Sequence, residues 1–276
     1  MVRVLKMDLY RLRRMLSFKV CMIIVFFLNI TEGPLEKLVF SIGKMVAKDD
    51  PEALAQLGEF PLEFRLGNII SAPLGRVDMV FFLLCVVWFS YADLHHGYIK
   101  NIAGQLPSRG HTVLSKFMAI QINCVIFMAI AVVGQIVGQL MVGKKMLIEA
   151  SYTNDSETVI YSMGEAAARC VIFWLLLLSV CSMILLLTTG LGSNIAGSII
   201  AVLAGSGLLS TAYLGISVGI NKLFNFEKYF ELGDYMPDSV IHGHYDSMIR
   251  ATVVGAVWIF IMIPLTVYIF NRKDVK

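Results

Sequence analysis

The sequence has few residue patterns that could carry chemistry, and none of them builds a complete catalytic site. Gly138–Lys145 (GQLMVGKK) has the glycine and lysine spacing of a phosphate-binding loop, but it lacks the Ser or Thr that follows the lysine and it ends an apolar run. His242 and His244, with Asp246 nearby, form too thin a set for a metal site. The middles of the apolar runs contain no Asp, Glu, Lys, Arg or His, the groups that intramembrane hydrolysis and ion-coupled pumping use. We therefore expect no catalytic residue, no metal and no ATP hydrolysis in this chain.

Three glutamines offer neutral hydrogen bonding inside an apolar environment. Gln121, Gln135 and Gln139 share one face of a helix, because each residue turns the helix by about 100°. Gly134 and Gly138 lie beside them, with the small-xxx-small spacing that lets another helix approach closely. A second stripe of small residues follows later in the chain: Gly197, Ala201, Ala204, Gly205, Ala212, Gly215 and Gly219. Two interpretations stay open for these faces, packing within the chain and a subunit seam or translocation path.

The composition indicates a membrane-embedded protein. Of 276 residues, 57% are hydrophobic and 16% are charged, against about 45–50% and about 25% in soluble domains. The excess is gathered in long runs, as membrane spans require. All five cysteines fall inside these runs, and their number and spacing favour small buried apolar residues over disulfides: Cys21, Cys85, Cys124, Cys170 and Cys181.

Six runs are candidates for transmembrane helices. They are Leu16–Ile30, Val77–Tyr91, Phe117–Val142, Cys170–Thr189, Ile195–Asn221 and Ala251–Phe270. The runs are continuous and not alternating, which favours helices over a barrel. The sequence thus predicts one all-α integral membrane domain over residues 1–276.

An even number of spans puts both termini on one side of the membrane. The side with the termini carries 12 Lys and Arg residues, and the other side carries 11 spread over nearly twice as many residues. The denser side is expected to be cytoplasmic, with segments 1–19, 92–116, 190–194 and 271–276. The extracytoplasmic segments are then 31–76, 143–169 and 222–250.

Residues 1–19 precede the first span and are basic. Apolar residues recur there at helical spacing opposite Arg11 and Arg14, and they are Val4, Leu5, Leu9, Leu12 and Leu16. This pattern predicts a helix lying on the inner membrane surface, followed by an uncleaved first span. A simple basic flank is the alternative.

Residues 92–116 are a compact polar connection between two predicted spans. Asp93 is placed to cap a short helix, and its apolar side would consist of Ile99, Ile102, Ala103 and Leu106. Lys100, Arg109 and Lys116 add positive charge. Such a helix could act as a lever through which a soluble partner moves both spans, and a plain polar loop is the alternative.

This connection resembles the first inner loop of type 2 ABC exporter permeases, a family that includes bacterial bacitracin, lantibiotic-immunity and toxin-peptide exporters. The resemblance lies in the order Asp93, Gly97, Tyr98, Ile99, Lys100, Asn101, Pro107, Ser108, Arg109, Ser115 and Lys116. The family's usual pattern has Glu where Asp93 stands and Thr where Tyr98 stands. The stretch 7–12 (MDLYRL) is also similar to this family's interfacial N-terminus.

The resemblance implies a permease subunit of an ATP-driven exporter. It would pair with a second copy or a paralogue and bind two separate ATPase subunits, which would hold the ATP and Mg²⁺. The coupling helix would lie in 92–116, with re-entrant outer helices in 222–250. The cargo would be hydrophobic or amphipathic, in particular an antimicrobial or toxin-type peptide, exported across a bacterial cell membrane, and nucleic acid is not an expected partner.

Other functions remain as alternatives. One is an ion-gradient-driven secondary transporter or channel. A membrane-bound enzyme or protease and a purely structural anchor are the others, although the spans show no catalytic set at depth.

Overall fold

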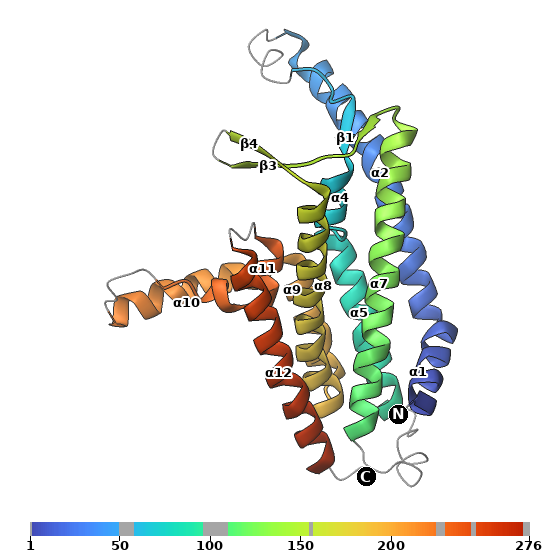
Figure 1. Ribbon diagram of the computed structural model, residues 1–276, viewed down its shortest axis with the longest axis vertical. Helices are drawn as coiled ribbons and strands as arrows, with labels where there is room; N and C mark the ends of the chain where they lie inside the picture. The colour runs from blue at the N-terminus through green and yellow to red at the C-terminus, as the bar shows by residue number, and fades with distance from the viewer. Residues whose placement is uncertain are drawn as a thin grey trace. The chain divides into compact units, whose positions relative to one another are not determined.

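The computed structural model describes residues 2–49, 58–95, 110–154, 157–224, 230–243 and 247–272 (Figure 1). In chain order the helices are α1 (Val2–Arg14), α2 (Leu16–Val46), α4 (Leu66–Ser71), α5 (Arg76–His95), α7 (Gly110–Met141), α8 (Met163–Leu185), α9 (Asn194–Ser206), α10 (Leu208–Phe224), α11 (Pro237–His242) and α12 (Met248–Arg272). Shorter turns are η1 (Ala47–Asp49), the π-helical turn η2 (Leu186–Gly190) and η3 (Leu232–Tyr235). The strands are β1 (Glu63–Arg65), β2 (Lys145–Leu147), β3 (Ala150–Asn154) and β4 (Glu157–Tyr161).

The protein is a multi-span, essentially all-helical membrane protein, as the sequence predicts. Five segments of the described chain are long and apolar enough to cross a bilayer: Leu16–Val46, Leu66–Ala92, Gly110–Met141, Met163–Gly190 and Met248–Arg272. The bent pair α9 and α10 would make a sixth span if the two are counted together. Pro34 and Pro264 lie inside α2 and α12, which membrane helices tolerate.

The first and third spans are longer than their apolar runs. α2 begins at the predicted Leu16 but continues beyond Ile30 to Val46, and α7 already begins at Gly110. Hydropathy reports where lipid could surround a helix, whereas hydrogen bonding decides where the helix ends. The predicted 31–76 segment therefore starts as helix, and the predicted 92–116 segment is helical at both ends.

The predicted fifth span, Ile195–Asn221, is not one straight helix. α9 ends at Gly207, whose φ of 79° is left-handed, and α10 then leaves at 87° (Figure 1). Glycine adopts this φ without the steric cost of a Cβ and is the usual end of a helix. Hydropathy does not register the break, because glycine is common within membrane helices.

The chain forms two compact units. Unit 1 contains residues 1–21, 74–126 and 171–276, and unit 2 contains residues 22–73 and 127–170. In unit 1, α5 and α9 pack closely at Gly205, which has no side chain. A Cβ added there would lie only 2.8 Å from the Cα of Val80. Four cysteines are buried as predicted, and Cys170 is half-buried.

Unit 2 joins parts of α2 and α7 to the small strands. A Cβ on Gly138 would lie 2.5 Å from the carbonyl oxygen of Ile30, so α2 and α7 touch backbone to backbone. β1 pairs in parallel with β2, and β3 pairs antiparallel with β4. Arg65 donates a hydrogen bond to Ser151, which connects the two strand pairs.

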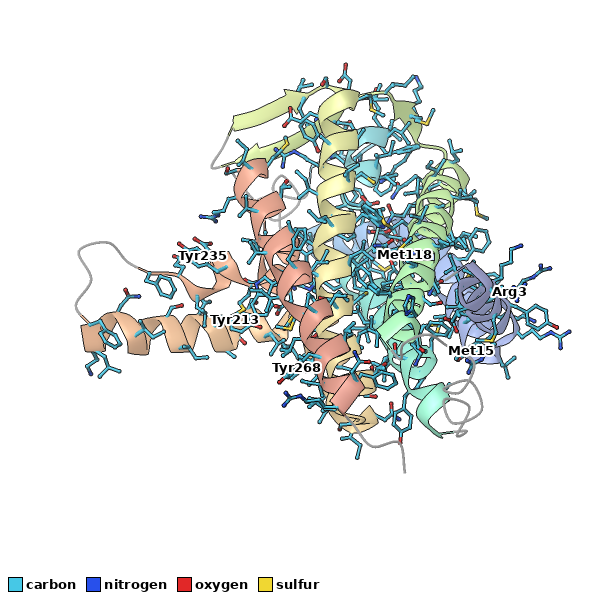
Figure 2. The ribbon with its side chains drawn as sticks, turned by 60° about the horizontal axis from the view of Figure 1, so that its bottom comes forward. Arg3, Met15, Met118, Tyr213, Tyr235 and Tyr268 are labelled. Carbon is cyan, nitrogen blue, oxygen red and sulfur yellow. The ribbon has the colours of Figure 1, made fainter. Side chains whose placement is uncertain are left out.

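In unit 1, side chains fasten the segment that follows α10. Asn221 donates to the carbonyl of Phe230 and accepts from its amide, at 2.7 and 2.8 Å. The Tyr213 hydroxyl donates to Asp238 at 3.2 Å, and Trp258 Nε1 donates to the carbonyl of Tyr235 at 2.8 Å (Figure 2). The described part of the predicted re-entrant region 222–250 thus contains the end of α10, the short helices η3 and α11, and the start of α12.

Candidate functional site

The most distinctive polar feature of unit 1 is a buried cluster where α1, α5, α7 and η2 meet. Its side chains are Asp8, Ser115, Lys116 and Thr189, together with the backbone of Ser90, and each of these residues is at most 1% exposed. α5 and α7 are the two helices that enter and leave the predicted coupling segment. Ser115 and Lys116 belong to the predicted segment 92–116, and Ser90 precedes it by two residues.

Asp8 is held by α7. The Ser115 hydroxyl donates a hydrogen bond to Asp8 Oδ2. On the other side, Arg11 Nη1 lies 3.9 Å from Asp8 Oδ1, one helical turn along α1. Asp8 falls between the buried residues Val4 and Leu12 on one face of α1, so the carboxylate is the polar point in an otherwise apolar contact.

Lys116 ties α7 to the end of α5. Its Nζ donates a 2.8 Å hydrogen bond to the carbonyl of Ser90, and Thr189 Oγ1 lies 3.5 Å from the same oxygen. At its start, α7 also meets α12, because Gly110 contacts Val267 and Val113 packs with Phe270.

The electrostatics of Asp8 reflect its burial. Removal from solvent raises the pKa of the Asp8 carboxyl above its ordinary value, while the Ser115 hydroxyl and the charges of Lys116 and Arg11 act in the opposite direction. A buried charge persists where partners compensate it. The hydrogen bonds of the cluster lock α1, α5 and α7 together.

The structure tests the predicted coupling residues only in part. Asp93 lies in α5, and Gly97, Tyr98, Ile99, Lys100, Asn101 and Arg109 lie outside the described residues. Lys116 was expected to add positive charge to a cytoplasmic surface, but it is completely buried. The reason is that α7 begins before Lys116, which turns this side chain toward α5.

The predicted N-terminal helix exists as α1, but its buried face is rotated from the expected one. Val4, Asp8 and Leu12 are buried, Leu9 and Arg11 are half-buried, and Arg14 is exposed over the ring of Tyr10. Leu16 is also exposed and begins α2. The displacement follows from Ser115, which gives Asp8 a partner and thereby brings an acidic residue into the contact.

The glycines of the predicted seam divide into two groups. Gly134 and Gly138 pack against Asn29 and Ile30 of α2 within unit 2, so packing within the chain occupies this face. Gly215 and Gly219 on α10 have no atom within 4 Å of a Cβ built on them. Gln121, Gln135 and Gln139 are all half-buried, and Gln139 Oε1 has no hydrogen-bond partner within the described chain.

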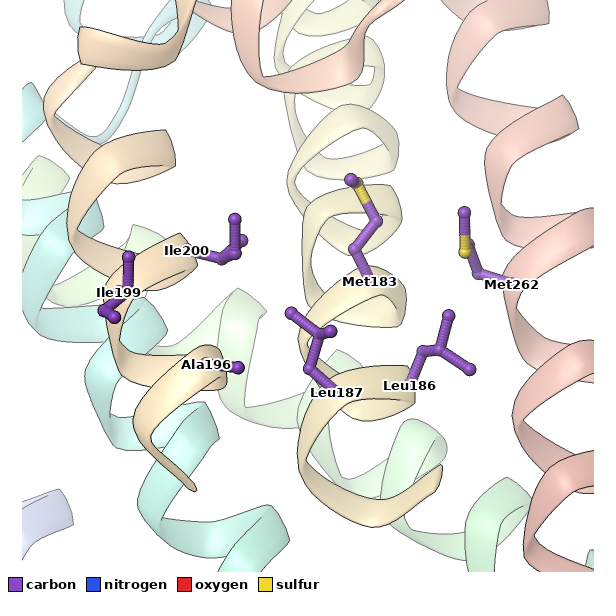
Figure 3. A pocket seen from close by; sticks show the side chains of 7 residues that line it. All are labelled: Met183, Leu186, Leu187, Ala196, Ile199, Ile200 and Met262. Carbon is purple, nitrogen blue, oxygen red and sulfur yellow. The ribbon is translucent and has the colours of Figure 1, made fainter. Parts of the chain in front are cut away.

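Unit 1 also contains an apolar cavity of about 470 Å³ (Figure 3). Met183 of α8 and Leu186 and Leu187 of η2 form one wall, Met262 of α12 contributes a second, and the third wall is α9 with Ala196, Ile199 and Ile200. This volume is in the range of small-molecule sites. With no polar side chain in its lining, the cavity suits hydrocarbon and offers no means of orienting a polar group.

Metal binding finds no support among the described residues, which contain no group of three His, Cys, Asp or Glu side chains placed to hold an ion. His242 Nε2–H donates a 2.7 Å hydrogen bond to the carbonyl oxygen of Ala204, and His244 and Asp246 lie outside the described chain. Lys144 of the loop-like sequence pairs with Glu36 at 2.6 Å, as a structural ion pair.

Ser90, Ser115 and Thr189 were not predicted as site residues. One signal was available: Asp8 is four residues from both Val4 and Leu12, so an acid stands on the apolar face of a helix. Its partner on α7 could not be chosen from the sequence, because 107 residues separate the two.

No protein-family model matches the sequence, and no curated protein matches it significantly.

Proposed function

We propose that this protein is the transmembrane permease subunit of an ATP-driven exporter, moved by a separate ATPase that binds the segment between α5 and α7. The single observation that supports this most is the buried cluster of Asp8, Ser90, Ser115 and Lys116. A push on residues 96–109 reaches α5 and α7 first. Because Lys116 bonds the two helices and Asp8 adds α1, the three helices would respond as one body.

The cavity supports a hydrophobic or amphipathic cargo. Its seven lining residues are aliphatic side chains and methionines, and methionine adapts to apolar ligands of varied shape. A peptide with apolar side chains, such as an antimicrobial or toxin-type peptide, belongs to this class. The cavity abuts η2, and π-helical turns are frequent at functional sites.

A site-specific photo-crosslink tests the partner directly. A benzophenone amino acid replaces Tyr98 in the proposed coupling segment, and in a matched variant it replaces the exposed Tyr235 of the segment between α10 and α12. After irradiation of native membranes, mass spectrometry should identify an ATPase with a complete GxxxxGK[ST] loop attached at position 98 and not at 235. Recovery of no such ATPase, or equal recovery at both positions, would contradict the proposal.

Coupling between the permease and the ATPase can be tested once the ATPase has been identified. Arg109→Ala and Gly97→Leu should each lower the ATPase activity of the reconstituted complex while leaving the amount of permease in the membrane unchanged. Arg14→Ala, which removes an exposed arginine on α1, is the control. Unchanged activity in both coupling variants would place the ATPase contact elsewhere.

A second candidate, an ion-gradient-driven transporter, gains support from one observation. Lys116 is a buried ionisable side chain within a membrane-spanning helix, and Asp8 interacts with it electrostatically, which is typical of ion and proton pathways. Uptake or efflux of a hydrophobic dye by proteoliposomes containing this chain alone distinguishes the two. Transport driven by an ion gradient without nucleotide, and abolished by Lys116→Met, would favour this second function.

A further inference from the structure

The far end of α2 carries an exposed apolar stripe in unit 2. Leu35, Leu38, Ile42 and Met45 follow one another at intervals of three, four and three residues, which is the spacing of the a and d positions of a coiled coil. Val39 and Val46 widen the stripe on one side. These six side chains have exposed fractions between 51% and 80%.

The opposite face of α2 is already occupied within unit 2. Gly33 packs against the backbone of Gly138, Glu36 pairs with Lys144, and the ring of Phe40 lies 5.3 Å from that of Phe60. At about 100° per residue, Leu38 and Ile42 point roughly opposite to Gly33. The helix is therefore held on one side, and the stripe is on its other side.

The far half of the stripe lies beyond the reach of the lipid tails. α2 has 31 residues and is about 46 Å long at about 1.5 Å per residue, whereas a hydrocarbon core is about 30 Å thick. The uncharged run that starts after Lys19 ends at Glu32, and Glu36, Lys37 and Lys44 follow. A core that begins after Lys19 extends over about 20 residues, to near Val39. Ile42, Met45 and Val46 lie past that point in this charged region and need a protein cover.

We propose that the stripe is a contact between two copies of this chain, in which the α2 extensions pack in parallel as a short coiled coil. Two copies inserted in the same direction and related by a twofold axis along the membrane normal bring the same residues face to face. Leu38 at d and Ile42 at a suit a two-stranded pair.

The distribution of charge also fits a second copy. Lys37 and Lys44 lie on the α7 side of α2, and the sector of the helix that contains Leu38 and Ile42 has no charged residue. Two identical surfaces therefore meet without placing like charges opposite each other. The pairing segment is short, but each helix continues from a membrane span and needs no nucleation of its own.

This inference rests on the proposed function in one respect, since it names a contact of the permease pair. Its test uses neither ATP nor an ATPase. Failure of the contact would leave the coupling segment as proposed, and failure of ATPase binding would leave the contact standing.

Disulfide trapping in membranes tests the contact. Leu38→Cys and Ile42→Cys should each give a covalent dimer on mild oxidation, because symmetric a and d positions face their own copies. Lys37→Cys, on the other side of the same helix turn, and the parent chain with its five native cysteines should give none. Monomer from both stripe variants, or equal dimer from Lys37→Cys, would overturn the proposal.

A charge exchange tests the same pairing without oxidation. Leu38→Glu should lower co-purification of two differently tagged copies at least several-fold, and co-expression of Leu38→Glu with Leu38→Lys should restore it. Failure of the mixed pair to associate better than Leu38→Glu alone would count against a symmetric contact. A double variant, Met45→Cys with Leu54→Cys, tests whether the chain's own 50–57 segment covers the stripe. An intrachain disulfide without covalent dimer on oxidation would overturn the proposal.

Discussion

The Ser115 hydroxyl donates a hydrogen bond to the carboxylate of Asp8, joining α7 to the N-terminal helix across 107 residues of sequence. Both residues are buried. The next residue on α7, Lys116, bonds the backbone of α5. Two adjacent side chains thus connect one helix to two others, beside the segment proposed to receive the ATPase.

Ser115→Ala should destabilise unit 1. The substitution leaves a buried carboxylate without its hydroxyl donor, at a cost of about 1–3 kcal/mol in the free energy of unfolding. Chemical unfolding in mild detergent, followed by loss of α-helical circular dichroism, measures it. Thr252→Ala, which removes an exposed hydroxyl bonded within its own helix, should stay within about 0.5 kcal/mol, and equal effects of the two would contradict the role of Ser115.

Lys116→Met should lower the free energy of unfolding more than Ser115→Ala does. Adding Asp8→Asn should restore part of this loss. Removing the lysine leaves only Arg11 to compensate the buried Asp8 charge, a loss of up to about 3–5 kcal/mol. Neutralising Asp8 in the same chain removes the charge that has lost part of its compensation. A double-mutant cycle measures the coupling, and strictly additive losses would show that the two charges act independently.

The burial of Asp238 predicts that the free energy of unfolding depends on pH. Burial raises the pKa of Asp238 from 3.8 to about 6, and the hydrogen bond from Tyr213 acts in the opposite direction. The folded state therefore binds the Asp238 proton more tightly than the unfolded state does. The stabilising contribution of the protonated Asp238 carboxyl is complete below about pH 4 and is lost as the pH rises through about 6. The unfolding free energy of the parent chain minus that of Asp238→Asn should fall by on the order of 2–3 kcal/mol as the pH rises through this window.

The comparison with Asp238→Asn isolates this group from its neighbour. Burial lowers the pKa of His242, which gives a contribution of opposite sign, lost as the pH falls. Both proteins contain His242, so its contribution cancels in the difference. Parallel stability curves between pH 4 and 7 would show that Asp238 titrates normally.

Two glycines on membrane helices should respond oppositely to alanine. In Gly138→Ala the new Cβ meets the backbone of Ile30 at 2.5 Å, so α2 and α7 must separate, which costs at least about 1–3 kcal/mol. Gly219→Ala meets nothing within 4 Å and should gain about 0.5–1 kcal/mol from helix propensity. Thermal unfolding in detergent measures both, and a neutral Gly138→Ala would mean that the helix contact is looser than described.

Two buried or half-buried asparagines should also differ. Both amide atoms of Asn123, 1% exposed on α7, have no hydrogen-bond partner in the described chain, so Asn123→Leu should stabilise the protein by about 1–3 kcal/mol. Asn221 bonds Ser217 and Phe230 through its amide, and Asn221→Leu should destabilise by a similar amount. A destabilised Asn123→Leu would reveal a partner for this amide that forms in the membrane.

The amino-acid sequence alone determined the membrane class and the approximate location of every long helix. It could do so because burial in hydrocarbon demands continuous apolar runs, and such runs are read residue by residue. The apolar runs did not predict the extension of α2 to Val46 or the break at Gly207. Both depend on local backbone hydrogen bonds and φ values, to which hydropathy is insensitive.

Only the tertiary structure decided which polar residues meet. Asp8 and Lys116 looked from the sequence like basic-flank and loop residues, and each is buried because another helix supplies its partner. Gly134 and Gly138 showed the sequence signature of close packing, but their partner was fixed only when α2 came to lie against α7. A stretch of sequence specifies the face that a helix offers, whereas the identity of the opposing surface arises from contacts between residues far apart in the chain.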